Sequence, residues 1–142
     1  VGIADYFKIL AKFHFDKLPT TLFDQTNQIF QLFAAQEELL AQPFIDFLQS
    51  KNTIRLLGLP NWERDRRAPT FSFTVKNQKS ADIPPLLHPE KVAVGYGNFY
   101  AKRLIEAVGI QDSEDGVIRV SMAHYNSSGE VDRLISSLDR VF

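Results

Sequence analysis

A change in the spacing of apolar residues near residue 51 is the feature that most restricts what this chain can fold into. Before it, apolar residues recur every three or four positions through residues 1–13 and 22–50, which is the periodicity of amphipathic helices. After it, short apolar or alternating segments typical of strands are separated by turn residues and by further helical segments. We therefore expect long N-terminal helices followed by an α+β fold, with a small, mainly antiparallel sheet of about four strands covered by helices.

Particular residues place several boundaries in this order. Strands are expected at residues 53–57, 71–75, 91–96 and 117–123, and later helices at 81–87, at 98–108 and from 127 onward. Pro43 lies inside the second helical pattern and should kink that helix or divide it near Ala41, because proline has no amide hydrogen. Gly109 is expected just after a helix, and Ser127 with Glu130 forms a capping box that begins the last helix.

Length and charge allow one domain and exclude several classes of function. The 142 residues fit a single domain of about 150 residues. Residues 1–50 are expected to be linker and connecting helices, and residues 51–142 to be the α+β unit. The 16 basic and 17 acidic residues give a net charge of -1, which excludes a basic field over the whole domain for nucleic acid. No apolar run reaches the roughly 18 residues of a membrane span.

The chain contains no cysteine, which excludes disulfides, cysteine-ligated metals and a thiol nucleophile within it. This composition and the lack of a targeting pattern lead us to expect a cytoplasmic location. The chain opens at Val1 and its single methionine is Met122. We therefore expect it to be a piece of a longer protein.

Two patterns that could indicate a metal or phosphate site lack the required spacing. His14, His88 and His124 are far apart and form no metal-ligand motif, so surface or hydrogen-bonded core histidines are the better interpretation. Gly95 and Gly97 follow an expected strand and precede an expected helix, as in a phosphate-binding loop. The third glycine and the later acidic residue of that motif are absent. The sequence therefore predicts no metal site, and it assigns no cofactor-binding residue.

Arg119 is the residue whose pattern points most directly to binding. Alternation along the last strand places Ile118, Val120 and Met122 on the face under the helices, and Arg119 with Ser121 on the opposite face. A guanidinium group matches a carboxylate through two parallel hydrogen bonds, which a lysine cannot reproduce. The pattern alone fits an intramolecular ion pair equally well.

Three motifs carry a resemblance to a known family. They are RVSMAHYN at residues 119–126 followed by EVDRL at 130–134, RAPTFSF at 67–73, and VAVGYGNFYA at 92–101. In this order and spacing they resemble the small C-terminal domain of class V aminotransferases, in the cysteine desulfurase-like group. The similarity covers about residues 25–142.

The resemblance implies a fold-type-I enzyme dependent on pyridoxal 5'-phosphate, a transferase or lyase whose small domain closes over the active site. Arg119 matches the arginine that receives the α-carboxylate of the amino-acid substrate, and Ser121, Asn98 and Tyr100 are further candidates for substrate binding. Tyr100 stands where true desulfurases keep their persulfide-forming cysteine, and Gly95 where many members hold another arginine. Both departures count against sulfur mobilisation.

The resemblance also implies parts that this chain lacks. Pyridoxal chemistry needs a Schiff-base lysine, and none of the three histidines is followed by lysine as in the family motif. We therefore expect a missing large cofactor-binding domain as partner, a homodimeric enzyme, no catalytic residue in this chain and no cofactor bound by it alone. The alternative is an independent α+β interaction or ligand-binding module without enzymatic activity.

A domain separated from its partner should expose the surface of the lost contact. We expect an apolar patch made by some of the N-terminal phenylalanines and self-association of the chain through it. The candidate residues are Phe7, Phe13, Phe15, Phe23 and Phe30. The alternative is that these rings belong to the core, because apolar residues at helical spacing most often do.

Overall fold

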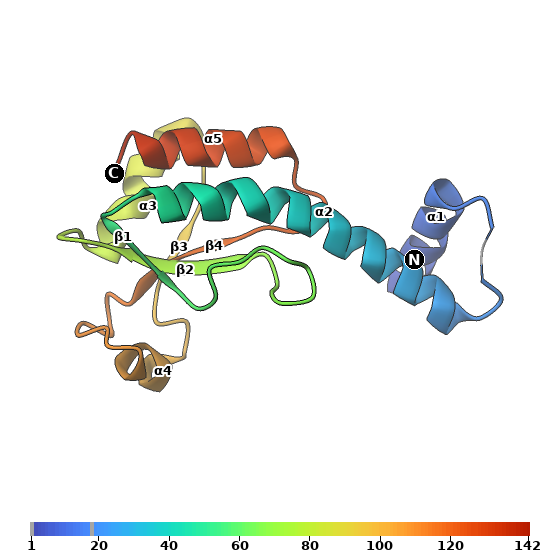
Figure 1. Cartoon of the computed structure of the whole chain (residues 1–142), viewed down its shortest axis with the longest axis horizontal. Helices are drawn as coiled ribbons and strands as arrows, with labels where there is room; N and C mark the ends of the chain where they lie inside the picture. The colour runs from blue at the N-terminus through green and yellow to red at the C-terminus, as the bar shows by residue number, and fades with distance from the viewer. Residues whose placement is uncertain (1, 18) are drawn as a thin grey trace.

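A four-stranded antiparallel sheet with helices on both faces forms the centre of the structure, a computed structural model that describes residues 2–17 and 19–142 (Figure 1). The strands are β1 (Ile54–Leu57), β2 (Thr70–Val75), β3 (Gly95–Gly97) and β4 (Val117–Ser121). The helices are α1 (Ile3–His14), α2 (Leu22–Ser50), α3 (Ile83–Leu87), α4 (Lys102–Ala107) and α5 (Ser128–Asp139), and 3-10 turns at Ser80–Asp82 and His88–Glu90 flank α3. The expected α+β class and antiparallel sheet are confirmed.

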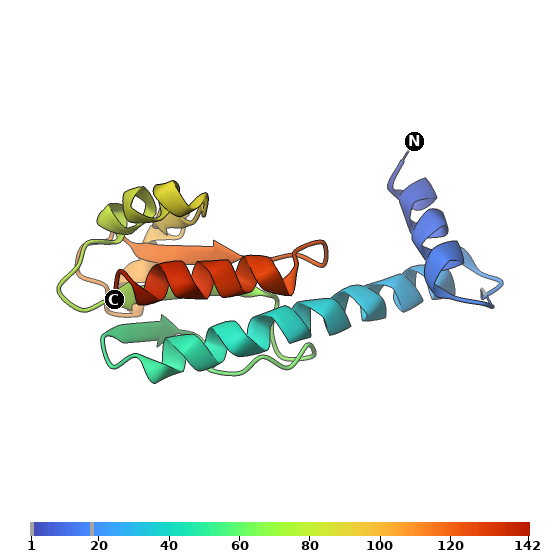
Figure 2. The same ribbon diagram turned by 90° about the horizontal axis from the view of Figure 1, so that it is seen from above.

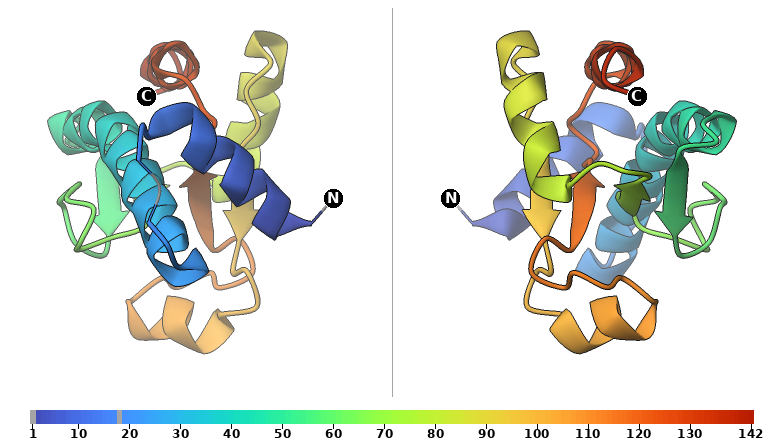
Figure 3. Two further views of the ribbon diagram at one scale, coloured as in Figure 1. Left: turned by 90° about the vertical axis from the view of Figure 1, so that its right-hand side faces the viewer. Right: turned by 90° about the vertical axis from the view of Figure 1, so that its left-hand side faces the viewer.

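The strands lie in the order β1-β2-β4-β3, and every neighbouring pair is antiparallel. Helices α2, α3 and α5 cover one face of the sheet, and α4 lies on the other face (Figures 1 and 3). Helix α1 packs on the N-terminal end of α2, away from the sheet (Figure 2). None of the helices in the described ranges is long and apolar enough to cross a membrane.

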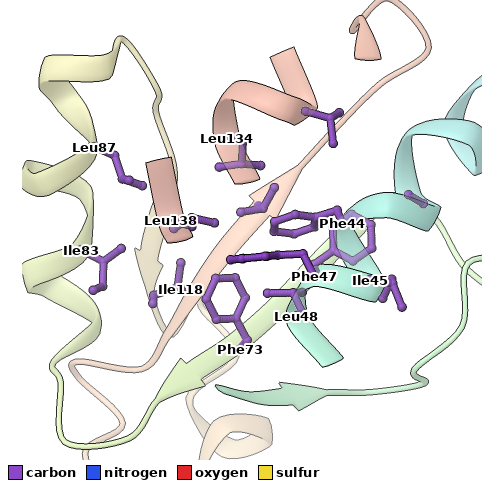
Figure 4. Close-up of a cluster of buried hydrophobic side chains, with 14 of the residues drawn as sticks. Phe44, Ile45, Phe47, Leu48, Phe73, Ile83, Leu87, Ile118, Leu134 and Leu138 are labelled. Atoms are coloured by element: carbon purple, nitrogen blue, oxygen red, sulfur yellow. The ribbon is translucent and has the colours of Figure 1, made fainter. Parts of the chain in front are cut away.

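The core lies between the sheet and the helices α2, α3 and α5 (Figure 4). Phe44 and Leu48 of α2 meet Phe73 of β2 and Ile118 of β4 there, all within 1% of complete burial. From Ile118 onward the burial along β4 alternates as expected, with Arg119 exposed between buried apolar neighbours, while Val117 at the start of the strand is also buried. The second half of α2 thus shares one core with the sheet, while the division at residue 50 stays a prediction.

Pro43 does not divide α2, which runs without interruption from Leu22 to Ser50. The expectation of a split near Ala41 is therefore wrong. Pro43 has no amide hydrogen to donate to the carbonyl group of Leu39, and Leu39 is exposed, so this carbonyl can be hydrated. The buried residues on both sides, Ala41 and Phe44 among them, hold the two halves against the same core.

Two expected elements are shorter than their sequence patterns. The strand expected at residues 91–96 is irregular until Gly95, and Lys91 has a left-handed backbone with φ 57°. The helix expected at 98–108 begins only at Lys102, because Phe99 and Tyr100 also have positive φ values. Its end is as expected, with Gly109 at φ 83°.

The capping box at the start of α5 is confirmed. The Glu130 amide donates to Ser127 Oγ at 3.3 Å, and Glu130 Oε2 accepts from the Ser127 amide at 2.7 Å. Hydrogen bonds from the Ser127 backbone and side chain, and then from Asn126, hold the pKa of Glu130 below its usual value. The carboxylate form of Glu130 is therefore the form that the folded chain favours.

Replacing Glu130 by glutamine should remove a pH-dependent part of the stability. Because folding lowers the pKa of Glu130, its contribution is fully present above the unfolded-state pKa of about 4.3 and is lost as pH falls through the folded-state pKa. The difference in free energy of unfolding between wild type and Glu130→Gln, measured in urea, should thus shrink on acidification. Glu63→Gln, at an exposed glutamate outside any cap, is the control. A constant difference across this pH range would contradict the prediction.

Helix α1 and the first half of α2 form a helical arm (residues 3–17 and 19–36) that contacts the loop between β4 and α5. Tyr6 Oη and His124 Nε2 are hydrogen-bonded at 3.1 Å, and the His124 ring stacks on Phe33 with centroids 3.6 Å apart. His124 is thus a half-buried, hydrogen-bonded histidine, as expected. These contacts join the helical arm to the domain that carries the sheet.

The helical arm exposes some of the phenylalanines that were expected to form an apolar patch. Phe13, Phe23 and Phe30 are 82%, 74% and 52% exposed, while Phe7 and Phe15 are partly buried. Phe7 packs edge-on against Phe30, with centroids 5.6 Å apart. Exposure is therefore observed for three of the five rings, while their union in one apolar patch and self-association through it stay predictions.

Sedimentation velocity at increasing concentration should show self-association of the 142-residue chain. Changing Phe13 and Phe23 together to serine should weaken the association constant at least about tenfold, because burying one such ring contributes about 1.5–3 kcal/mol. Leu59→Ser, at a half-exposed leucine outside the helical arm, should leave association unchanged. A chain that sediments as a monomer at all concentrations would disprove this prediction.

Candidate functional site

Arg119 lies on the face of the sheet opposite α2 and α5, and its guanidinium group contacts the ring of Phe99. The guanidinium carbon lies 3.7 Å from the ring centroid. Within residues 2–17 and 19–142, no carboxylate forms an ion pair with Arg119 and no acceptor takes a hydrogen bond from its side chain. The intramolecular ion pair left open by the sequence is therefore not observed. The N–H groups of Arg119 are available to an external planar anion.

Ser121 lies on the same face as Arg119, two positions further along β4. Thr70 lies directly opposite it on β2, and the Thr70 hydroxyl donates to Ser121 Oγ at 3.3 Å. The Ser121 hydroxyl keeps its own hydrogen for a further acceptor. Arg119 and Ser121 are thus two donors on one exposed strip of β4.

Asn98 and Tyr100 belong to the turn between β3 and α4, but they play different parts in it. Asn98 Nδ2 donates to the carbonyl oxygen of Ser113 at 3.2 Å, and Asn98 Oδ1 accepts from the Tyr100 amide at 3.1 Å. Both polar groups of Asn98 therefore hold the turn. The Tyr100 side chain is fully exposed. The structure does not bring either side chain against Arg119.

Gly95 is the residue that the structure does bring to Arg119. It pairs directly with Arg119 across β3 and β4. A Cβ atom at Gly95 would lie 3.2 Å from two ring carbons of Phe99, so the ring covers Gly95 closely. Gly95, Phe99 and Arg119 form one group of contacts, which we call the Arg119 cluster.

Phe99 is the member of the Arg119 cluster that sequence reasoning missed as a site residue. The sequence predicts a helix over residues 98–108, which would have included Phe99. In the structure Phe99 has φ 50°, a conformation that non-glycine residues seldom adopt. No spacing or propensity signal indicates such a turn.

Arg67, in the second of the three motifs, has a structural role. Its guanidinium donates to the carbonyl oxygens of Leu59 at 2.7 Å, Asn61 at 3.1 Å and Thr70 at 2.9 Å. It also lies 4.5 Å from the centroid of the Phe71 ring. Burial lowers the pKa of Arg67 below its usual value. These bonds hold the loop between β1 and β2.

The lysines of this chain do not fit a pyridoxal phosphate site. A Schiff-base lysine needs a sheltered amine that can lose its proton. Seven of the eight lysines are exposed, and Lys51 is half-buried but forms an ion pair with Asp139. No group of three or more His, Asp or Glu side chains that could hold a metal ion occurs in the ranges that the structure describes.

Comparison with known proteins identifies the family. The family described as aminotransferase class-V matches residues 24–134. The chain is 33% identical over 127 residues to an aminotransferase-like protein of Gibberella zeae, covering 87% of this chain and 31% of that protein. It is 33% identical over 107 residues to a probable cysteine desulfurase of Pseudomonas putida, covering 75% of this chain and 24% of that protein.

Solved structures agree with this at the level of the fold. A cysteine desulfurase of Thermococcus onnurineus superposes with a TM-score of 0.68 at 22% identity, covering 84% of this chain and 29% of that one. The cysteine desulfurase CsdA of Escherichia coli gives a TM-score of 0.62 at 23% identity, covering 75% of this chain and 24% of that one. The chain spans about a third or less of the length of these relatives. It belongs to the class V aminotransferase family and has a cysteine desulfurase-like fold.

Proposed function

We propose that this chain is the small C-terminal domain of a longer pyridoxal phosphate-dependent enzyme, that it closes over the active site, and that Arg119 binds the α-carboxylate of an amino-acid substrate. The observation that carries the proposal is the exposed guanidinium of Arg119, which contacts Phe99 and forms no ion pair within the described ranges. A charged group on a sheet, without an internal partner, favours an external anion.

Arg119 would act by binding and orienting the substrate. Its planar fork can donate two parallel hydrogen bonds to a carboxylate, which fixes the direction of the substrate as well as its position. The Ser121 hydroxyl lies on the same face and can donate to a neighbouring oxygen. The cofactor, the Schiff-base lysine and the bond-breaking chemistry would come from a large domain outside this chain, in an enzyme expected to be a homodimer.

The turn after β3 argues against a desulfurase that relays sulfur through this domain. Tyr100 occupies the exposed tip of the turn, and a phenol cannot form a persulfide. No other residue of the chain can do so, because it contains no cysteine. We propose an amino-acid substrate whose reaction needs no thiol from this domain.

Arg119→Lys in the longer enzyme tests the proposal. The lost bidentate contact should lower kcat/KM about 10- to 150-fold, because a charge-assisted hydrogen-bonded pair contributes roughly 1.5–3 kcal/mol. Folding should be unaffected, since the side chain is exposed. Arg103→Lys, at an exposed arginine of α4, is the matched control and should retain full activity.

Two outcomes would contradict the proposal. Unchanged kcat/KM in Arg119→Lys, together with a markedly lower melting temperature, would make Arg119 a structural residue. A protein in which no lysine-bearing domain of the family precedes this chain would support the independent interaction module instead.

A further inference from the structure

We propose that Phe99 is a positioning residue for Arg119, because its ring holds the guanidinium in the orientation that receives the substrate carboxylate. This inference rests on the proposed function of Arg119 and assigns to a second residue the task of presenting it. Three features of the Arg119 cluster support it: the contact between ring and guanidinium, the backbone that directs the ring onto the sheet, and the glycine beneath the ring.

The contact limits the freedom of an exposed arginine. The Arg119 side chain is long and would otherwise sample many rotamers at a strand surface. With its guanidinium carbon 3.7 Å from the centroid of Phe99, the cation is attracted to the ring face and one side of it is covered. The N–H bonds of a guanidinium lie in its own plane, where a carboxylate can accept two of them. Less entropy is then lost when the substrate binds.

The backbone of the turn is arranged to place this ring. Phe99 and Tyr100 follow one another with φ values of 50° and 62°, and two successive non-glycine residues in the left-handed region are costly. Asn98 holds the turn with its side chain, and its carbonyl oxygen accepts from the Ala101 amide at 2.8 Å. The result is that Phe99 faces the sheet while the Tyr100 side chain is fully exposed.

Gly95 makes room for the ring. It lies opposite Arg119 in the sheet, and the Cβ of any other residue would lie 3.2 Å from Phe99 Cε1 and Cζ, closer than ordinary contact. Any side chain at position 95 would require the Phe99 ring to shift by a few tenths of an ångström. The absence of a side chain at Gly95 therefore allows the Phe99 ring to lie where it contacts the guanidinium of Arg119.

The contact can be measured in the 142-residue chain by NMR of the Arg119 Nε–Hε group. In the wild type, the ring current of Phe99 should shift this resonance away from those of the other exposed arginines. Phe99→Leu should return it to their position, and Phe99→Tyr, which keeps the ring, should retain the shift. Phe13→Leu, which removes a ring exposed on the helical arm, is the control and should change nothing. A wild-type resonance without the shift would overturn the inference.

Kinetics of the longer enzyme test the positioning itself. Phe99→Leu should raise KM for the amino-acid substrate about two- to fivefold with little change in kcat, the effect expected from losing an exposed cation–π contact. Phe99→Tyr should restore KM. Gly95→Ala, which displaces the ring by a few tenths of an ångström, should raise KM in the same direction but less, and serves if Phe99→Leu folds poorly.

The outcomes separate this inference from the proposed function. If Arg119→Lys impairs the enzyme but Phe99→Leu and Gly95→Ala leave KM unchanged, Arg119 binds substrate without help from Phe99 and the inference is wrong. If Phe99→Leu lowers only the melting temperature, Phe99 is a structural residue and the inference is also wrong. If Arg119→Lys has no effect, the proposed function fails and the role of Phe99 falls with it.

Discussion

Phe44→Ala should lower the free energy of unfolding by about 3–5 kcal/mol, because it removes a ring from the centre of a closely packed core. Phe44 is completely buried, and its ring meets Phe71 edge-on with centroids 5.0 Å apart. Its centroid also lies 6.4 Å from that of Phe73, so the cavity left by alanine would remove packing contacts from both phenylalanines of β2. Urea unfolding measures the loss, and thermal unfolding should show a drop of about 10 °C or more.

Phe23→Ala is the matched control, since it removes the same ring from the same helix. Phe23 is 74% exposed, and its replacement should change stability by no more than about 0.5 kcal/mol. Equal losses in the two variants would mean that the core does not lie where the structure places it.

Gly116→Ala should destabilise the chain by roughly 2–4 kcal/mol or more, from backbone strain and from collision. Gly116 has φ 64°, which any residue with a Cβ adopts at a cost. A Cβ there would lie 2.2 Å from the carbonyl carbon and oxygen of Gly97, and 2.7 Å from the Asn98 amide nitrogen. The backbone of the turn that carries Phe99 would have to move, so the Arg119 cluster should be disturbed as well.

Gly129→Ala provides the comparison for this variant. Gly129 lies in the first turn of α5, and a methyl group added to it would have no neighbouring atom within 4 Å. Alanine there should therefore be neutral or should stabilise the helix by up to about 1 kcal/mol. Denaturant unfolding of both variants checks the prediction. A tolerated Gly116→Ala would show that β3 and the start of β4 do not approach so closely.

Elements with long periodic patterns or explicit caps could be predicted from the sequence. The stripe of α2, the alternation of β4 and the Ser127–Glu130 box each lead to the observed element within a few residues. In these cases the sequence signal for the element is local, because the residues that form the buried face or the cap lie close together in the chain. The side of the sheet that carries Arg119 follows from alternation alone.

The segment around β3 could not be predicted in this way. Val92 and Val94 alternate like a strand, yet they have no strand partner and only pack against the core. The residues that do pair with β4 include Gly95 and Gly97, which have low strand propensity. The pairing of β3 depends on the position of β4 beside it in the folded chain, and local patterns in a single sequence do not indicate that position.

The candidate site shows the same limit. The exposed position of Arg119 was predictable, because the alternation along β4 places it on the face away from the core. Phe99 was not, because its contact with Arg119 depends on left-handed φ values that the turn imposes. Propensities describe the backbone conformation that a residue type prefers, whereas the surrounding turn holds Phe99 in a conformation that phenylalanine seldom adopts.

Both outer edges of the sheet are short, and this limits how copies of the chain can associate. β1 has four residues and β3 has three, so each edge leaves few backbone groups unpaired. A long, flat edge strand exposes a row of N–H and C=O groups with which a strand of another molecule can pair. A short edge strand exposes few of these groups. Contacts between copies should therefore form through side chains of the helical arm, and such an association should be reversible on dilution. Addition of strands at the sheet edges, which would build extended β-sheets, should not occur.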